Sequence, residues 1–93
     1  MTIQITSFDW DEHNLNHIEN HPAHPIGSDS VQEVLLSPKR KIRRTWQDRY
    51  IAYGQSMDGQ YLTVVFENKE HGIIRPISAR PMAHHERKLY GRK

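Results

Sequence analysis

The chain has 93 residues, of which 35% are hydrophobic, and its mean hydropathy is -0.84. At this length we expect one domain, residues 1–93, with a single core small enough that stability could depend on a partner. The sequence contains no cysteine, which excludes disulfide scaffolds, thiolate zinc sites and cysteine nucleophiles.

Charge is distributed unevenly along the chain. Residues 1–37 contain six acidic side chains and no Lys or Arg, whereas residues 38–93 contain thirteen Lys and Arg and five acids. This division predicts a basic surface for a polyanion, unless the two parts interleave in space and cancel. Both interpretations stay open at this point.

No apolar run reaches membrane-spanning length, and the start lacks the basic and then apolar order of a secretory signal. With the absence of cysteine, this predicts a soluble protein of the reducing cytoplasm that does not contact a membrane.

The first elements are a strand and a short helix. Apolar and polar side chains alternate over residues 3–8, which predicts a strand with one buried face. Asp11 is a suitable N-cap for a helix that carries Leu15 and Ile18 and ends before Pro22.

A second helix is predicted after a loop. Ser30 and Glu33 have the spacing of a capping box, and Pro38 would end the helix. Its apolar face consists of Val31, Val34 and Leu35.

From Lys39 onward the apolar period changes to two, which indicates strands. They are expected around Ile42 and over residues 50–56, 61–67 and 73–79, with a hairpin turn at Asp58-Gly59. Pro81 suits the first position of a closing helix.

This order, β-α-α-β-β-β-β-α, predicts an α+β fold. We expect an antiparallel sheet of four to five strands, with the two N-terminal helices on one face, a C-terminal helix, and a second face open for binding.

The end of the last strand is the most informative segment. Arg80 lies at a strand end just before a helix start, where backbone N–H groups and an arginine together favour an anion. Further motifs accompany it along the chain: Phe8-Asp-Trp-Asp11, Asn14-Leu-Asn-His17-Ile18, Tyr53-Gly-Gln, Asp58-Gly-Gln-Tyr61, and Ser78-Ala-Arg80 followed by Glu86, Arg87 and Tyr90.

In this order and spacing, the motifs over residues 8–90 resemble the BrnT family of bacterial toxins. The resemblance implies a RelE-like fold and an endoribonuclease toxin of a type II toxin-antitoxin system that inhibits translation and growth. It also implies two partners: a cognate antitoxin, BrnA-like and DNA-binding, and RNA, either free or as mRNA on the ribosome. No cofactor and no metal site are expected.

RNA cleavage without a metal needs a base, an acid and positive charge at the phosphate. Arg80 is the leading candidate for the charge, because it matches the family motif and a guanidinium donates two hydrogen bonds to phosphate. Glu86 could be its structural ion partner, or could hold it in place for catalysis. Arg75 shares a two-residue period with Ile73 and Ile77, so it could lie near the rim of their face or be an ordinary exposed strand arginine. The resemblance places Arg49, at the start of the strand that leads to Tyr53, near the same surface.

The basic stretch is interpreted as a surface that guides RNA. Alternation along a strand sends its side chains to both faces, so they cannot all reach one phosphate; a charged edge that prevents aggregation is the alternative. The stretch comprises Lys39, Arg40, Lys41, Arg43 and Arg44.

Among seven histidines, His17 alone matches the family pattern and is the candidate acid or base. His13, His17 and His21 share a helical spacing that suits a metal, but surface or capping roles fit them better. Three further residues are RNA-binding candidates: Trp10, Arg87 and Tyr90. For Trp10 and Tyr90 the alternative is a packing role.

The competing function is a non-catalytic module of the same fold that binds nucleic acid or protein. A toxin requires a cluster of arginines on the open sheet face with at least one titratable neighbour, so the arrangement of these side chains separates the two hypotheses.

Overall fold

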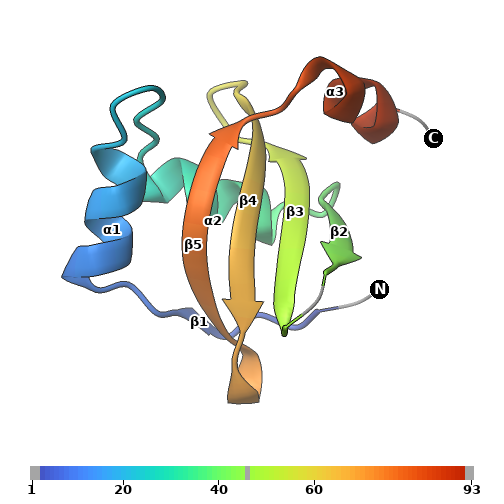
Figure 1. Cartoon of the computed structure of the whole chain (residues 1–93). Coiled ribbons are helices and arrows are strands. Elements are labelled where there is room, and N and C mark those ends of the chain that lie inside the picture. Colours follow the sequence, from blue (N-terminus) through green and yellow to red (C-terminus); the bar gives the residue numbers. More distant parts are fainter. Residues whose placement is uncertain (1–2, 46, 92–93) are drawn as a thin grey trace.

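The computed structural model describes residues 3–45 and 47–91. In these ranges it contains three α-helices, five strands and one 3-10 turn (Figure 1). In chain order they are β1 Ser7–Phe8, α1 Glu12–Glu19, α2 Ser28–Leu36, β2 Lys41–Arg44, β3 Arg49–Gln55, β4 Tyr61–Asn68, η1 Glu70–Gly72, β5 Ile73–Pro81 and α3 His84–Tyr90.

The strands form one sheet in the order β1-β5-β4-β3-β2. All neighbours are antiparallel except β1, which runs parallel to β5. The predicted α+β class and element order are confirmed, with the parallel β1 as the departure from a purely antiparallel sheet.

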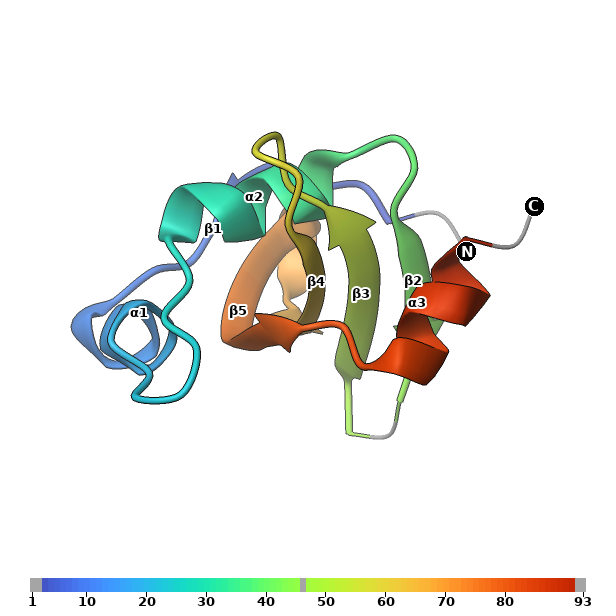
Figure 2. The same ribbon diagram turned by 90° about the horizontal axis from the view of Figure 1, so that it is seen from above.

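The helices lie around the sheet in three different places (Figures 1 and 2). Helix α2 covers one face, α1 lies beside β5 at the edge, and α3 lies over a corner of the opposite face. We call that opposite face, between α1 and α3, the open face. Its side chains alternate with those that face α2.

The core lies between α2 and the sheet. The predicted apolar face of α2 is confirmed, because Val31, Val34 and Leu35 are fully buried. They pack with buried residues of the central strands: Ala52, Leu62, Val64, Phe66 and Ile74. Gly54 permits the close approach of α2, since a Cβ atom there would lie 3.0 Å from Cγ1 of Val34.

The strand predicted over residues 3–8 is wrong in length, because only Ser7–Phe8 pairs with β5. Ile3 is buried in the core without strand pairing, and its carbonyl accepts a hydrogen bond of 2.9 Å from Nη2 of Arg40. A side chain therefore replaces the backbone partner that a longer strand would have needed.

The start of α2 also differs from the prediction. The helix begins at Ser28, two residues before Ser30, and the capping box with Glu33 does not form. Oε2 of Glu19 instead accepts from the backbone N–H of Ser28 at 2.9 Å, while Oε1 of Glu33 accepts from that of Met57 at 3.0 Å. An acceptor from α1 thus serves the first turn of α2.

Pro81 is not the first residue of the closing helix, as predicted, but the last residue of β5. The N–H of Met82 donates to the carbonyl of Tyr61 at 2.9 Å, which prolongs the sheet pairing beyond the strand. Helix α3 begins only at His84, after Ala83, whose N–H donates to Oε1 of Glu86 at 2.8 Å.

The predicted cap of α1 is confirmed. Oδ1 of Asp11 accepts from the backbone N–H of Asn14 at 3.0 Å, and Oδ1 of Asn14 accepts from that of Asp11 at 2.8 Å. This reciprocal pair fixes the helix start.

Candidate active site on the open face

A bulge in β5 determines which side chains reach the open face. Thr63 pairs with Arg80 and Glu67 pairs with Arg75, but the register shifts between Val65 and Phe66. In a regular strand, residues five apart point to opposite faces. The extra residue at Ile77 reverses this parity, so that Arg75 and Arg80 share the open face.

Near the start of β3, three charged side chains form a row across the sheet. Arg49 pairs with Glu67, which in turn pairs with Arg75. Side chains that lie directly opposite on neighbouring strands have Cβ atoms roughly 5 Å apart. The two arginines therefore flank one carboxylate.

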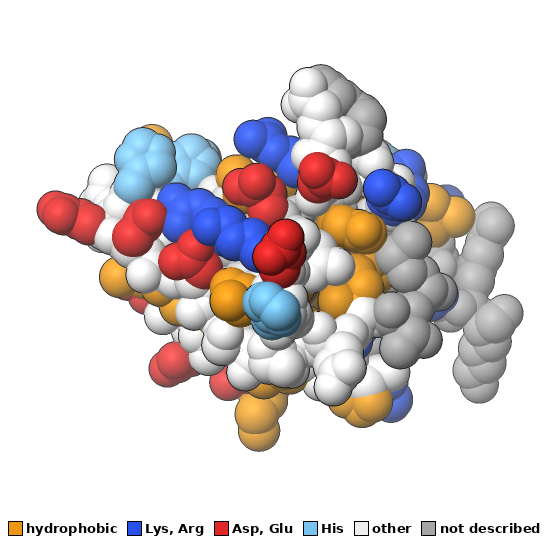
Figure 3. Space-filling model, turned by 90° about the horizontal axis from the view of Figure 1, so that it is seen from below, with side chains coloured by type: hydrophobic (Ala, Val, Ile, Leu, Met, Phe, Trp, Pro, Cys, Tyr) orange, Lys and Arg blue, Asp and Glu red, His pale blue; other side chains and the backbone are white. Residues whose placement is uncertain are grey.

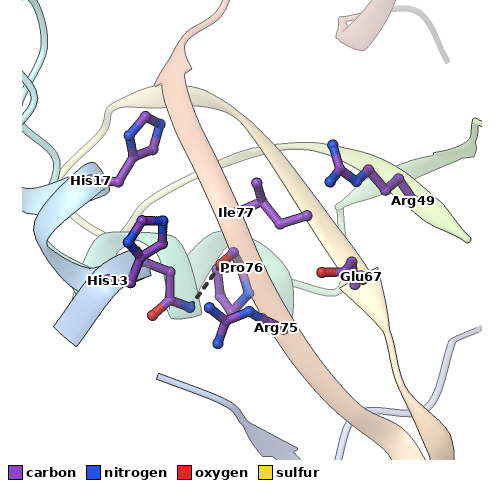
Figure 4. A pocket seen from close by; sticks show the side chains of 8 residues that line it. His13, His17, Arg49, Glu67, Arg75, Pro76 and Ile77 are labelled. Atoms are coloured by element: carbon purple, nitrogen blue, oxygen red, sulfur yellow. Dashed lines mark hydrogen bonds between the residues drawn. The ribbon is translucent and has the colours of Figure 1, made fainter. Parts of the chain in front are cut away.

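This row forms one side of a hollow of about 320 Å³, which we call the α1 hollow. Helix α1 forms the other side with His13 and His17, one helical turn apart (Figure 4). The complete lining is His13, Asn14, His17, Arg49, Glu67, Arg75, Pro76 and Ile77.

Asn14 fixes α1 to β5 and so positions the histidines. Its side chain is 3% exposed, and Nδ2 donates to the carbonyls of Pro76 at 2.8 Å and Asp9 at 3.0 Å. Because a buried amide with all these partners is costly to displace, α1 is held against the strand. His13 and His17 therefore face the arginines from a fixed distance.

Arg75 is held from the opposite side by acidic residues. Its Nη1 lies 2.8 Å from Oδ2 of Asp11 and 3.6 Å from Oδ2 of Asp9. The hydrogen bond from Arg75, and then the backbone N–H of Asn14, lower the pKa of Asp11 to about 2, and the same contact raises the pKa of Arg75. Arg75 is thus a fixed cation.

The acidic and basic parts of the sequence interleave at this edge. Nζ of Lys69 lies 2.8 Å from Oδ2 of Asp9, and Lys and Arg side chains lie among Asp and Glu side chains when the molecule is seen from below (Figure 3). Two of the six N-terminal carboxylates, those of Asp9 and Asp11, therefore pair with Lys69 and Arg75.

Arg49 differs from Arg75 in having no fixed partner. Its side chain is exposed and makes no hydrogen bond or ion pair with any residue in the described ranges. Arg49 can therefore donate its guanidinium N–H groups to an incoming anion beside Arg75.

Arg80 and Glu86 lie at the other end of the open face. The guanidinium donates from Nη1 to Oε1 at 2.7 Å and from Nη2 to Oε2 at 2.9 Å. Burial raises the pKa of Glu86, but the bonds from Arg80, the N–H of Ala83 and the hydroxyl of Thr63 lower it to about 2. Both predicted residues are brought together, but away from the α1 hollow.

Aromatic and cationic side chains also connect α3 to the sheet. The guanidinium of Arg87 lies 3.5 Å from the ring centroid of Tyr61, and the ring of Tyr90 meets Tyr61 edge to face at 6.1 Å. Nζ of Lys41 lies 5.7 Å from the Tyr90 centroid and donates to the carbonyl of Leu89 at 3.1 Å. Arg87, Tyr90 and Lys41 thus hold α3 on the sheet.

The basic stretch divides between the two faces, as strand alternation predicts. Lys41 pairs with Tyr53 and Arg43 with Ile51 on the open face. Arg44 lies on the opposite side, with its guanidinium carbon 6.0 Å from the ring centroid of Tyr50. Lys39 is exposed in the preceding loop.

Arg40 and Trp10 have structural contacts. Nη1 and Nη2 of Arg40 donate to the carbonyls of Ser37 and Ile3. Trp10 packs against the core, and its Nε1 donates to Oε1 of Gln32 on α2 at 2.8 Å. Neither side chain joins the residues of the α1 hollow.

His17 also belongs to a cluster of histidines that extends beyond the α1 hollow. His21 stacks on His24 with ring centroids 3.9 Å apart, and His17 meets His21 edge to face at 5.8 Å. In the described ranges no three His, Asp or Glu side chains are arranged to bind a metal ion.

Of the residues that line the α1 hollow, the sequence analysis selected Arg49, Arg75 and His17 as candidates. It gave His13 a surface or capping role and did not select Glu67. The spacing of His13 and His17 placed both on one helical face, which was a usable signal. Glu67 could have been found by counting outward from the Asp58-Gly59 turn, because hairpin pairing places it opposite Arg49.

The fold and the open face define a small α+β protein with arginines and histidines around one hollow of its sheet. Residues 10–86 match the model of the family described as ribonuclease toxin, BrnT, of type II toxin-antitoxin system. The chain belongs to this family.

Membership makes the chain a ribonuclease toxin of a type II system, with RNA as substrate and a cognate antitoxin as partner. No curated protein matches the chain significantly. None of the helices in the described ranges has the length and apolar character needed to cross a membrane.

Proposed function

We propose that the α1 hollow is the place where this toxin cleaves RNA, as an endoribonuclease that uses side chains alone. The observation that supports it most is the meeting of Arg49 and Arg75 with His13 and His17 around one hollow. Arginines with titratable neighbours are what separates a nuclease from a binding module of the same fold.

In the proposed reaction the 2′-hydroxyl of RNA attacks the adjoining phosphorus, and the 5′ oxygen leaves. One of the two imidazoles takes the proton from the hydroxyl and the other gives a proton to the leaving oxygen. Arg49 and Arg75 stabilise the negative charge that develops on the phosphate oxygens.

The surrounding carboxylates give the two arginines different tasks. Arg75 is already oriented by Asp11, so it requires little reorganisation when RNA binds. Arg49 is free to follow the phosphate. Glu67 pairs with both residues in the sheet register and so lies between the two cations.

In this proposal Arg80 binds a phosphate of the RNA next to the one that is cleaved. It lies five residues from Arg75 along β5, which corresponds to roughly 15 Å of strand. One side of its guanidinium is bound by Glu86, but the side chain remains 46% exposed. It can therefore extend the phosphate-binding path along the open face.

Single substitutions test the assignment. Arg49→Ala should lower the cleavage rate constant at saturating RNA roughly 100- to 1,000-fold, as loss of one preorganised donor does. His17→Gln and His13→Gln should lower it by roughly 100-fold or more. Arg44→Ala, an exposed arginine on the other side of the sheet, is the matched control and should cleave like the wild type.

Two results would contradict the proposal. If Arg49→Ala cleaves at the wild-type rate while Arg80→Ala is inactive and folded, the reaction takes place at the Arg80 end. If cleavage disappears in EDTA and returns with a divalent cation, the side chains alone do not suffice.

We also propose that the antitoxin, BrnA-like and DNA-binding, covers the open face with acidic residues and so excludes RNA. The unpartnered Arg49 and Arg43 and the exposed Lys39 favour an acidic partner. Antitoxin and an uncleavable RNA should then compete for the toxin. Comparing free mRNA with translated mRNA would decide whether the substrate is bound to the ribosome.

A further inference from the structure

A second recess lies where α3 crosses β2 and β3, and we call it the α3 recess. Its volume is about 170 Å³ and most of its lining is apolar. The lining residues are Lys41, Ile42, Arg43, Tyr53, Glu86, Leu89 and Tyr90. Leu89, which is 54% exposed, contributes apolar surface to this recess.

Aromatic rings and cations alternate around the recess. Tyr53 and Tyr90 are half-buried, and the positive charge of Lys41 lies over Tyr90. Arg43 is exposed at the rim, with no hydrogen bond or ion pair to a residue in the described part of the chain.

The α3 recess and the α1 hollow belong to one surface. Strand β3 carries Arg49 and Tyr53, four residues apart and therefore on the same face, at roughly 13 Å. A single RNA strand lying along β3 on the open face would pass from one to the other. An apolar floor with cations at its rim suits a nucleobase whose phosphate remains outside.

We propose that the α3 recess binds one nucleobase of the substrate, stacked on Tyr53 and Tyr90, with the adjoining phosphate bound by Arg43. The recess would thereby fix the distance between a recognised base and the bond cleaved in the α1 hollow. This inference rests on the proposed function, because it assumes that RNA lies across the open face during cleavage.

An abasic scan tests the proposal. In an oligoribonucleotide with a mapped cleavage site, each position in turn carries a ribose without its base, and kcat/KM is measured. For the wild type, one position at a fixed distance from the cut should lose roughly five- to 150-fold, as removal of one stacked base does.

The variants assign that loss to the recess. In Tyr53→Leu the intact RNA should already be cleaved more slowly. Removing the base at the same position should then lower kcat/KM of this variant by less than about twofold, because both changes remove the same contact. Tyr53→Phe, which keeps the ring, should retain the wild-type profile. Leu36→Ala, which removes a 55% exposed leucine outside the recess, is the surface control and should retain the wild-type profile.

The outcomes separate this inference from the proposed function. If the wild type and Tyr53→Leu are equally sensitive to every abasic position while Arg49→Ala is inactive, the α3 recess binds no base and the α1 hollow stands. If Arg49→Ala cleaves at the wild-type rate, the proposed function is wrong, and the base-binding inference that rests on it is overturned as well. If Tyr53→Leu changes only the affinity for the antitoxin, the recess belongs to that partner and the proposal is overturned.

Discussion

Replacing Arg80 with alanine should destabilise the protein at neutral pH, and the loss should disappear in acid. The carboxylate of Glu86 is 8% exposed and receives both Nη groups of Arg80. Without the arginine, a buried carboxylate keeps only the N–H of Ala83 and the hydroxyl of Thr63 as donors. An ionised group left with fewer partners is costly.

The magnitude follows from the pKa of Glu86. Its lowering from 4.5 to about 2 corresponds to roughly 3 kcal/mol of unfolding free energy. Arg80 supplies only part of this lowering and its side chain is 46% exposed, so solvent screens the pair. We therefore expect Arg80→Ala to lose about 2 kcal/mol at pH 7.

The sign of the pH dependence is fixed by the direction of the pKa. A carboxyl whose pKa is lower in the folded protein contributes stability that is complete above its ordinary pKa of 4.5 and is lost as the pH falls toward 2. The difference between wild type and Arg80→Ala should thus be largest above about pH 5 and close to zero near pH 2.

Urea unfolding at several pH values measures this difference, with Glu86→Gln and the double variant completing a thermodynamic cycle. The double variant should lose less than the sum of the two single losses. An equal loss at pH 3 and pH 7 would show that packing and not the ion pair is responsible. No loss at all would leave Arg80 free for RNA and would refute the structural part of this reasoning.

Three other predictions concern the rest of the molecule. Asn14→Ala should lower the unfolding free energy by about 2 kcal/mol because it leaves the buried carbonyl of Pro76 without a donor, whereas exposed Asn16→Ala should change it by less than about 0.5 kcal/mol in the same urea titration. Replacing Lys39 and Arg43 together with Gln should reduce the salt dependence of RNA binding by about 1.4 in slope if each contacts one phosphate; an unchanged slope would remove both from the RNA surface. Burial and the neighbouring charges of His24 and His17 lower the pKa of His21 below 6.5, so stability should fall as the pH drops below about 6.5, and His21→Gln should abolish that part of the fall in thermal unfolding curves.

Local signals in the sequence predicted the elements but not always their ends. Asp11 caps α1 through neighbouring residues, and the Asp58-Gly59 turn sets the β3–β4 hairpin within a few positions. The start of α2 depends on Glu19 from another helix, and no local pattern could indicate that contact. Predictions of where an element begins or ends are wrong where the hydrogen-bond partner is remote in sequence.

The candidate site divides in the same way. The residue types were predictable, because arginine and histidine are the side chains that phosphate chemistry requires. Which of these side chains lie together in the folded protein was not predictable. The resemblance placed Arg80 foremost, whereas His13, His17, Arg49 and Arg75 meet around a different hollow. That meeting depends on how α1 docks and on the register of β5, and both are tertiary properties.

Pro76 connects these two tertiary properties. Proline has no backbone N–H to give to a sheet ladder, and such residues occur in strands at edges or bulges. Here the register shifts beside Pro76, which turns Arg75 and Arg80 to one face, and its buried carbonyl accepts the hydrogen bond that fixes α1 through Asn14. One residue thus turns Arg75 and Arg80 to the same face and holds the histidines of α1 beside Arg75, so the candidate site combines side chains from both ends of the sequence.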